Sequence, residues 1–125
     1  MQKLPLKSYR DLIAWQRAMS LADAIHELVT SLPRRRSSLA SQLERAAISI
    51  PANIAEGYGR ASRRTYSHFL RIAQGSLKEL ETHLILAERV GVTPQRSTEA
   101  LLDQADELGR MLRSLITRVQ ERPAD

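Results

Sequence analysis

Three arginines follow a pair of glycines near the middle of the chain, in the segment EGYGRASRRTY. They are Arg60, Arg63 and Arg64, and Ser62 between them is a favourable N-cap for a helix that begins directly after it. The first turn of a helix has unpaired N–H groups and positive partial charge, so it attracts anions and mildly disfavours cations. We therefore predict that this segment binds phosphate, a ligand that guanidinium groups contact well.

The charge of the chain is concentrated around this segment. The 125 residues carry 19 Lys and Arg against 14 Asp and Glu, a formal net charge of +5. Between Arg34 and Arg71 there are eight Arg and two Glu, whereas Glu79 to Glu107 contains seven acidic residues and two Arg. A solvated surface that serves only solubility is the alternative to a polyanion site. Secondary candidates for nucleic-acid contact are Arg34, Arg35, Arg36, Arg45 and Arg71.

Residues for catalysis or metal binding form no recognisable pattern. Among the three His, His83 lies one helical turn from Glu79 in a loose Glu-x-x-x-His pattern, whereas a di-iron protein needs inward Glu and Glu-x-x-His pairs on several helices. There is no Cys for thiol or zinc-thiolate chemistry. The glycine segment lacks the spacing and the Lys of a phosphate-binding loop. We predict a protein that is not an enzyme and has no metal or cofactor.

Length and hydropathy predict the compartment. The first residues, MQKLPLKSYRDL, contain no apolar signal segment, and no window approaches about 18 consecutive apolar residues. We therefore expect one soluble domain over residues 1–125, located in the cytoplasm.

Apolar residues recur at spacings of three and four in four segments, which predicts four amphipathic helices. No segment shows the alternation of a strand, and short connections make successive helices antiparallel neighbours. We predict an all-α, antiparallel up-down-up-down four-helix bundle. In that topology the Arg34–Arg36 loop and the Arg60–Arg64 loop lie at opposite ends. The predicted helices are 8–32, 38–57, 62–90 and 94–121, with Gly91 at the C′ position of the third.

Polar and small residues interrupt the apolar pattern of the second and third predicted helices. Pro51 cannot donate to the carbonyl four residues earlier, which predicts a bend. Asn53 falls on the predicted core face, where an unpaired amide would cost about 1–3 kcal/mol, so we expect it to bond across to Ser76 or Glu79. Small residues, including Gly75, predict a close approach of these two helices.

Two blocks, SQLERAAISIPANIAEGYGR and FLRIAQGSLKELETHLILA, resemble the signature of a bacterial four-helix family. The family is named for proteins encoded in intervening sequences of large-subunit ribosomal RNA genes. The blocks are also similar to the accessory variability proteins of diversity-generating retroelements. The earlier segment YRDLIAWQRAMSLADAIHELVTSLP matches the first helix of the family, so the likeness covers about residues 9–91, and the fourth helix matches only in pattern. The matching residues are Arg45, Ser49, Pro51, Asn53, Glu56, Gly57, Gly75, Ser76, Glu79 and Glu81.

The resemblance implies a cytoplasmic homo-oligomer, a pentameric barrel of bundles that binds nucleic acid through basic surface and has no catalytic residues. For the retroelement relatives it implies association with a reverse transcriptase. Most matching residues are interpreted as packing and assembly positions. The chain departs from the family at Arg34–Arg36, where relatives are usually acidic, and at Glu44, where a basic residue is frequent. A further candidate interface is the wide face of the first helix with Leu12, Trp15 and Met19.

The predicted function is a non-catalytic, oligomeric module that binds RNA or DNA electrostatically. Contacts to phosphates alone give little sequence preference and a steep dependence on salt. The alternative is a protein-interaction scaffold, or an accessory subunit, that does not bind nucleic acid.

Overall fold

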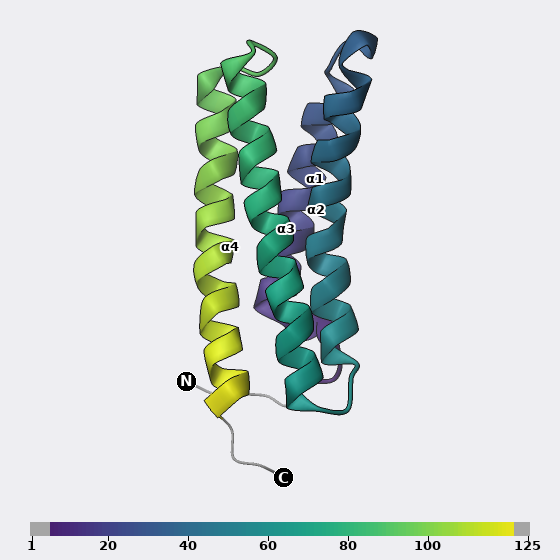
Figure 1. The fold of residues 1–125 in the computed structure, drawn as a ribbon, viewed down its shortest axis with the longest axis vertical. Helices are drawn as coiled ribbons and strands as arrows, with labels where there is room; N and C mark the ends of the chain where they lie inside the picture. The colour runs from purple at the N-terminus through teal and green to yellow at the C-terminus, as the bar shows by residue number, and fades with distance from the viewer. Residues whose placement is uncertain (1–5, 122–125) are drawn as a thin grey trace.

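The computed structural model describes residues 6–121 and contains four long α-helices and two short 3-10 turns (Figure 1). No strand occurs in this part of the chain, which confirms the predicted all-α class with four helices. The elements are η1 (Tyr9–Asp11), α1 (Ile13–Thr30), η2 (Arg34–Arg36), α2 (Ser37–Tyr58), α3 (Arg63–Arg89) and α4 (Gln95–Glu121).

The four helices lie side by side, and each contacts two others in the order α1, α2, α3, α4 and back to α1. The α2–α3 contact is the most extensive and the α1–α4 contact the least. In Figure 1 the α1–α2 and α3–α4 connections lie at one end of the molecule and the α2–α3 connection at the other. Consequently η2 with its three arginines is separated by the length of α2 from the arginines that begin α3.

One hydrophobic core runs between the helices and is built mainly from Leu, Ile and Ala. The predicted spacing of three and four is observed: the buried leucines of α3 and α4, with the buried alanines between them, recur at these intervals. Each fully buried Leu or Ile side chain contributes about 1.5–3 kcal/mol through the hydrophobic effect. These leucines are Leu70, Leu77, Leu80, Leu84, Leu101, Leu108, Leu112 and Leu115.

The first helix begins later than predicted, at Ile13 rather than at Ser8. Ser8 caps the separate turn η1: its Oγ accepts from the Arg10 N–H at 3.1 Å, and its own N–H donates to Asp11 at 3.2 Å. Leu12 is extended, with φ −73° and ψ 125°, which separates η1 from α1. The periodic pattern missed this break because Leu12 is buried like a helical core residue.

The caps of α3 follow the predictions. The Ser62 hydroxyl accepts from the Thr65 N–H at 3.0 Å. At the other end Gly91 has φ +76°, and the Val92 N–H donates to the Ala87 carbonyl at 2.8 Å, as in a Schellman motif. Because only glycine adopts this φ without strain, Gly91 sets the direction in which the chain enters α4.

The helices α2 and α3 approach closely at Gly57. A Cβ there would lie 2.8 Å from the Cβ of Phe69 and 3.2 Å from the Tyr66 carbonyl oxygen. Gly75 does not contribute to this approach, contrary to the prediction, because it is exposed and a Cβ there would have no neighbour within 4 Å. The helix α2 continues through the buried Pro51 as far as Tyr58.

Asn53 is half-buried, and the predicted direct bond to α3 is wrong. Its amide donates to the Ser49 carbonyl at 2.8 Å and to the Ser49 hydroxyl at 3.0 Å. The Ser49 hydroxyl in turn lies 2.7 Å from that of Ser76 in α3. Ile54, one residue further along, occupies the core position that the pattern gave to Asn53. Asn53 therefore reaches α3 through Ser49.

Candidate nucleic-acid interface

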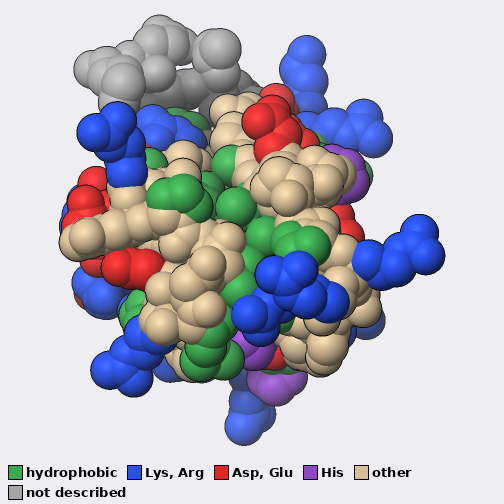
Figure 2. Space-filling view, turned by 90° about the horizontal axis from the view of Figure 1, so that it is seen from above, with side chains coloured by type: hydrophobic (Ala, Val, Ile, Leu, Met, Phe, Trp, Pro, Cys, Tyr) green, Lys and Arg blue, Asp and Glu red, His purple; other side chains and the backbone are tan. Residues whose placement is uncertain are grey.

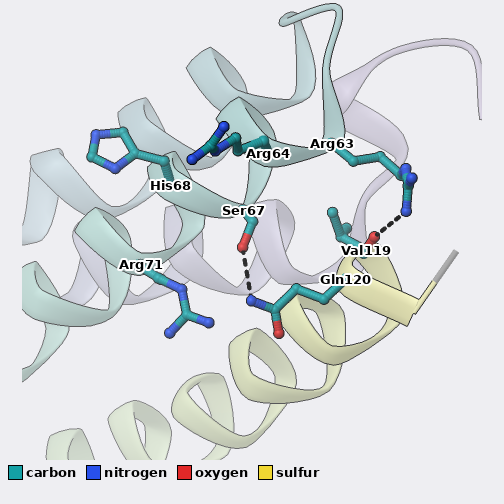
Figure 3. Close-up of a pocket in the computed structure, with 7 residues that line it drawn as sticks. All are labelled: Arg63, Arg64, Ser67, His68, Arg71, Val119 and Gln120. Atoms are coloured by element: carbon teal, nitrogen blue, oxygen red, sulfur yellow. Dashed lines mark hydrogen bonds between the residues drawn. The ribbon is translucent and has the colours of Figure 1, made fainter. Parts of the chain in front are cut away.

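A hollow of about 540 Å³ lies between the first turns of α3 and the last turn of α4 (Figure 3). Three of the predicted arginines and one histidine line it, and none of the lining residues that the structure describes is acidic. Three guanidinium groups, whose geometry suits a phosphate, therefore belong to the lining. The lining residues are Arg63, Arg64, Ser67, His68, Arg71, Val119 and Gln120.

Hydrogen bonds between α3 and α4 hold the hollow in shape. Gln120 Nε2 donates to the Oγ of the buried Ser67 at 3.4 Å, and Arg63 Nη1 lies 3.5 Å from the Val119 carbonyl oxygen (Figure 3). Ser67 and Gln120 were not predicted from the sequence, since neither belongs to a basic cluster and α4 lies far along the chain from the start of α3. Only the packing of α3 against α4 brings them together.

His68 was not among the predicted site residues, yet it lines the hollow between Arg64 and Arg71. A signal was present in the sequence: the three residues are spaced by four and three, which places them on one face of a helix. The His68 ring also contacts the Phe69 ring edge-on, with centroids 5.6 Å apart. His68 therefore belongs to the site through its position on α3.

Arg60 does not line the hollow, although it was a first-choice residue. Its guanidinium forms an ion pair with Glu56 one turn earlier. The same group lies over the Phe69 ring, 5.2 Å from the ring centroid. Such cation–π contacts contribute about 0.5–1 kcal/mol at exposed sites. The structure thus assigns Arg60 and Glu56 to the junction between α2 and α3.

Arg45 also forms an ion pair within the protein, joining α2 to α3. Its guanidinium contacts the Glu79 carboxylate and donates to Gln42 at 2.7 Å. His83 lies 3.3 Å from the same carboxylate. The hydrogen bond with His83, and the charge and hydrogen bond of Arg45, lower the pKa of Glu79 below its usual value. The predicted Asn53–Glu79 bond is replaced by this three-residue network.

The second basic segment lies at the other end of the molecule. Arg35 and Arg36 line a separate hollow with Leu39 of α2, and with His83 and Leu86 of α3. The structure therefore keeps the two predicted basic clusters apart, as expected from the order of the helices. Figure 2, viewed from above, shows Lys and Arg projecting on several sides with acidic groups between them.

The aromatic residue of α1 lies largely inside the molecule. Trp15 is half-buried and contacts Tyr9 edge-on, with ring centroids 5.2 Å apart, and Leu12 is buried. Of the three residues proposed as an interface, only Met19 is exposed. Among residues 6–121, Ile13 and Ile48 are the most exposed large apolar side chains, at 59% and 57%.

Two further findings on residues 6–121 concern metal binding and membrane-spanning helices. No group of three or more His, Asp and Glu side chains in this range could hold a metal ion. Within the same range, no helix combines the length and the hydrophobicity that crossing a membrane requires.

Comparison with known proteins places the chain in a family. The family model described as 23S rRNA-intervening sequence protein matches residues 10–114. The match includes most of α4, which the sequence likeness had covered only in pattern. No curated protein matches the chain.

A solved structure supports the same assignment. The chain is similar to a protein of unknown function from the S23 ribosomal protein family of Bacteroides thetaiotaomicron, at 25% identity and a TM-score of 0.79. The similarity covers 83% of this chain and 98% of that one. The predicted family is therefore confirmed: the chain belongs to the 23S rRNA-intervening sequence protein family.

Proposed function

We propose that this protein is a non-catalytic module that binds the phosphates of nucleic acid at the hollow between α3 and α4. The observation that carries the proposal is the composition of the lining: Arg63, Arg64, His68 and Arg71 contribute to it, and within residues 6–121 no acidic residue does. The start of α3 adds the positive partial charge of a helix N-terminus. An anion is therefore the ligand that this surface favours.

Binding through phosphates has a measurable signature. For duplex DNA, the slope of log binding constant against log salt concentration becomes more negative by about 0.9 for each phosphate that a cation neutralises. Phosphate contacts position a protein but do not read sequence. The chain has one Trp, three Tyr and one Phe, so stacking on bases contributes little.

The test is a filter-binding titration with structured RNA and with duplex DNA between about 50 and 300 mM salt, where affinity changes steeply. We expect an Arg63/Arg64/Arg71→Ala variant to lose at least about tenfold in affinity, equal to 1.4 kcal/mol. A variant that removes Arg10, Arg17 and Arg96 is the control, because it makes the same change in net charge elsewhere. Equal losses in both variants, or no binding by the wild type, would reject the proposal.

We also propose that the antiparallel bundle assembles into a homo-pentameric barrel in the cytoplasm. The exposed apolar residues Ile13 and Ile48 support self-association, as does the family resemblance. Sedimentation velocity at several concentrations tests the stoichiometry. A monomer that persists at high concentration would exclude the barrel.

A protein-interaction scaffold is the second proposal, and a largely apolar hollow between α1 and α4 favours it. Leu12, Ile13, Met111 and Leu115 contribute to its lining. For a retroelement-associated relative the partner would be a reverse transcriptase. A protein partner that remains bound after nuclease treatment, and is released by Ile13→Asp, would support this function over nucleic-acid binding.

A further inference from the structure

One exposed face of α3 carries a line of cations that continues well beyond the hollow. Its residues are spaced by four and three, so they lie on one side of the helix. All eight are exposed, four are Arg or Lys, and none is acidic. We call this face the α3 track; it comprises Arg64, His68, Arg71, Gly75, Lys78, Thr82, Leu86 and Arg89.

We infer that the α3 track is the docking surface for the backbone of a nucleic-acid duplex, which would lie along the helix. The inference rests on the proposed function and deepens it, because the hollow becomes one end of a longer site. At a rise of about 1.5 Å per residue, the distance from Arg64 to Arg89 is about 38 Å. One turn of duplex DNA is about 34–36 Å long, so the track would reach phosphates separated by a full turn.

The exposed face of α4 differs in charge pattern. Three exposed acids, Glu99, Asp103 and Asp106, lie between its arginines Arg96 and Arg110. Arg110 forms an ion pair with Asp106 one turn away. A polyanion laid along α4 would therefore meet carboxylates as well as guanidinium groups, whereas on the α3 track it would meet none in the line itself.

Three carboxylates of α3 lie beside the track: Glu88 directly precedes Arg89, and the other two form ion pairs. Glu79 is held by Arg45 and His83. Glu81 is mostly buried and lies 3.2 Å from the Lys78 ammonium, which is itself 69% exposed. Lys78 can turn from Glu81 to a phosphate, because its long side chain is flexible and its own end of the ion pair is exposed.

Gly75 lies near the middle of the track. A Cβ there would have no neighbour within 4 Å, so packing within the subunit does not require a glycine. Exposed glycine inside a helix lowers stability relative to alanine. The missing side chain leaves the helix backbone open for close approach, which a rigid duplex backbone would use.

The absence of aromatic side chains from the track favours a duplex over a single strand. Proteins that bind single strands combine cations with aromatic side chains on which bases stack. The track has no Phe, Tyr or Trp, and His68 provides its one ring. A duplex offers phosphates on its outside and needs no stacking platform.

The experiment measures affinity for a duplex DNA of about 24 base pairs, two turns long, across a range of salt concentrations. A Lys78→Ala/Arg89→Ala variant removes two track charges outside the hollow. We expect the salt slope to decrease in magnitude by about 2, one for each phosphate contact. An Arg10→Ala/Arg17→Ala variant makes the same charge change on η1 and α1, which do not contact α3, and should leave the slope unchanged.

A second pair of variants tests the centre of the track. Gly75→Glu and Gly75→Gln have similar size, and open space accepts either side chain. We expect the Glu variant to bind at least about tenfold more weakly than the Gln variant, because a carboxylate would face the phosphates. Circular dichroism confirms that both variants are folded.

The outcomes separate the inference from the proposed function. If the hollow variant loses binding while Lys78→Ala/Arg89→Ala and Gly75→Glu keep the wild-type slope and affinity, the site is confined to the hollow and the track is rejected. Tighter binding of a single strand than of the duplex would reject the duplex assignment. A changed oligomeric state in the track variants would show that the face lies between subunits. No duplex binding by the wild type would reject both proposals.

Discussion

Gly57 in α2 lies so close to Phe69 in α3 that a Cβ on the glycine would be 2.8 Å from the Cβ of Phe69. The Tyr66 carbonyl oxygen, at 3.2 Å from the same point, belongs to the α3 backbone and cannot rotate away. The missing side chain at Gly57 thus determines how closely the two helices pack. This contact also supports Phe69, on whose ring Arg60 lies.

Gly57→Ala is expected to destabilise the protein. The added methyl group forces α2 away from α3, and overpacking of this kind costs about 1–3 kcal/mol, which exceeds the gain in helix propensity. The measurement is urea unfolding, in which the midpoint should fall at constant m-value. Gly75→Ala is the matched control and should raise stability by up to about 1 kcal/mol, because its Cβ meets open space. Equal shifts of the urea midpoint in the two variants would contradict the role of Gly57 in the close packing of α2 against α3.

The pair of His26 and Glu44 predicts a pH-dependent link between α1 and α2. The Nδ1 of His26 lies 2.5 Å from Glu44 Oε2, and this hydrogen bond, with the Glu44 charge, raises the pKa of His26. Stabilisation from a raised histidine pKa is complete below about 6.5, the unfolded value, and is lost as the pH rises through the folded value. NMR titration should show a lower His26 pKa in Glu44→Gln, whereas Glu107→Gln, on α4, should not change it. An unchanged pKa in Glu44→Gln would disprove the link.

Tyr66 is expected to titrate late in alkali. Burial, and then the nearby Tyr58, raise the pKa of Tyr66 to about 12, with Arg118 acting in the opposite direction. Since the folded pKa exceeds the unfolded value of about 10, the stabilisation is present below pH 10 and decreases as the pH rises towards 12. Tyrosinate absorbance in the wild type and in Tyr66→Phe measures this step. A normal titration of all three tyrosines would contradict the packing of Tyr66 against Tyr58, whose ring centroids are 6.0 Å apart.

Arg60 and Arg64 are expected to have different roles although they are four residues apart. Arg60→Ala removes an ion pair and a ring contact, so it should lower the free energy of unfolding by about 1 kcal/mol. Its affinity for nucleic acid should stay within about twofold of the wild type. Arg64→Ala should show the reverse, with unchanged stability and a salt slope smaller by about 1. If Arg60→Ala lost binding and kept its stability, Arg60 would be a binding residue and this assignment would be wrong.

Much of the fold could be predicted because the spacing of apolar residues and the residues that cap helices are local signals. The spacing of Leu70, Leu77 and Leu84 marks the buried face of α3, and Ser62 and Gly91 mark its ends. Each of these signals depends on residues within a few turns of one helix. The start of α1 could not be predicted in this way, because Leu12 satisfies the helical pattern although its backbone is extended.

Within the site, the sequence by itself determined that a basic segment begins a helix capped by Ser62, and that the chain belongs among four-helix proteins. Only the tertiary structure decided which arginines share a surface. Arg60 turns to Glu56 and Phe69, Arg45 reaches Glu79 on the next helix, and Gln120 joins the hollow from the far end of the chain. The physical reason is that a periodic pattern gives only the face of the helix on which a side chain lies. The partner of that side chain depends on how the neighbouring helices are placed. Close contacts such as that of Gly57 with Phe69 set this placement.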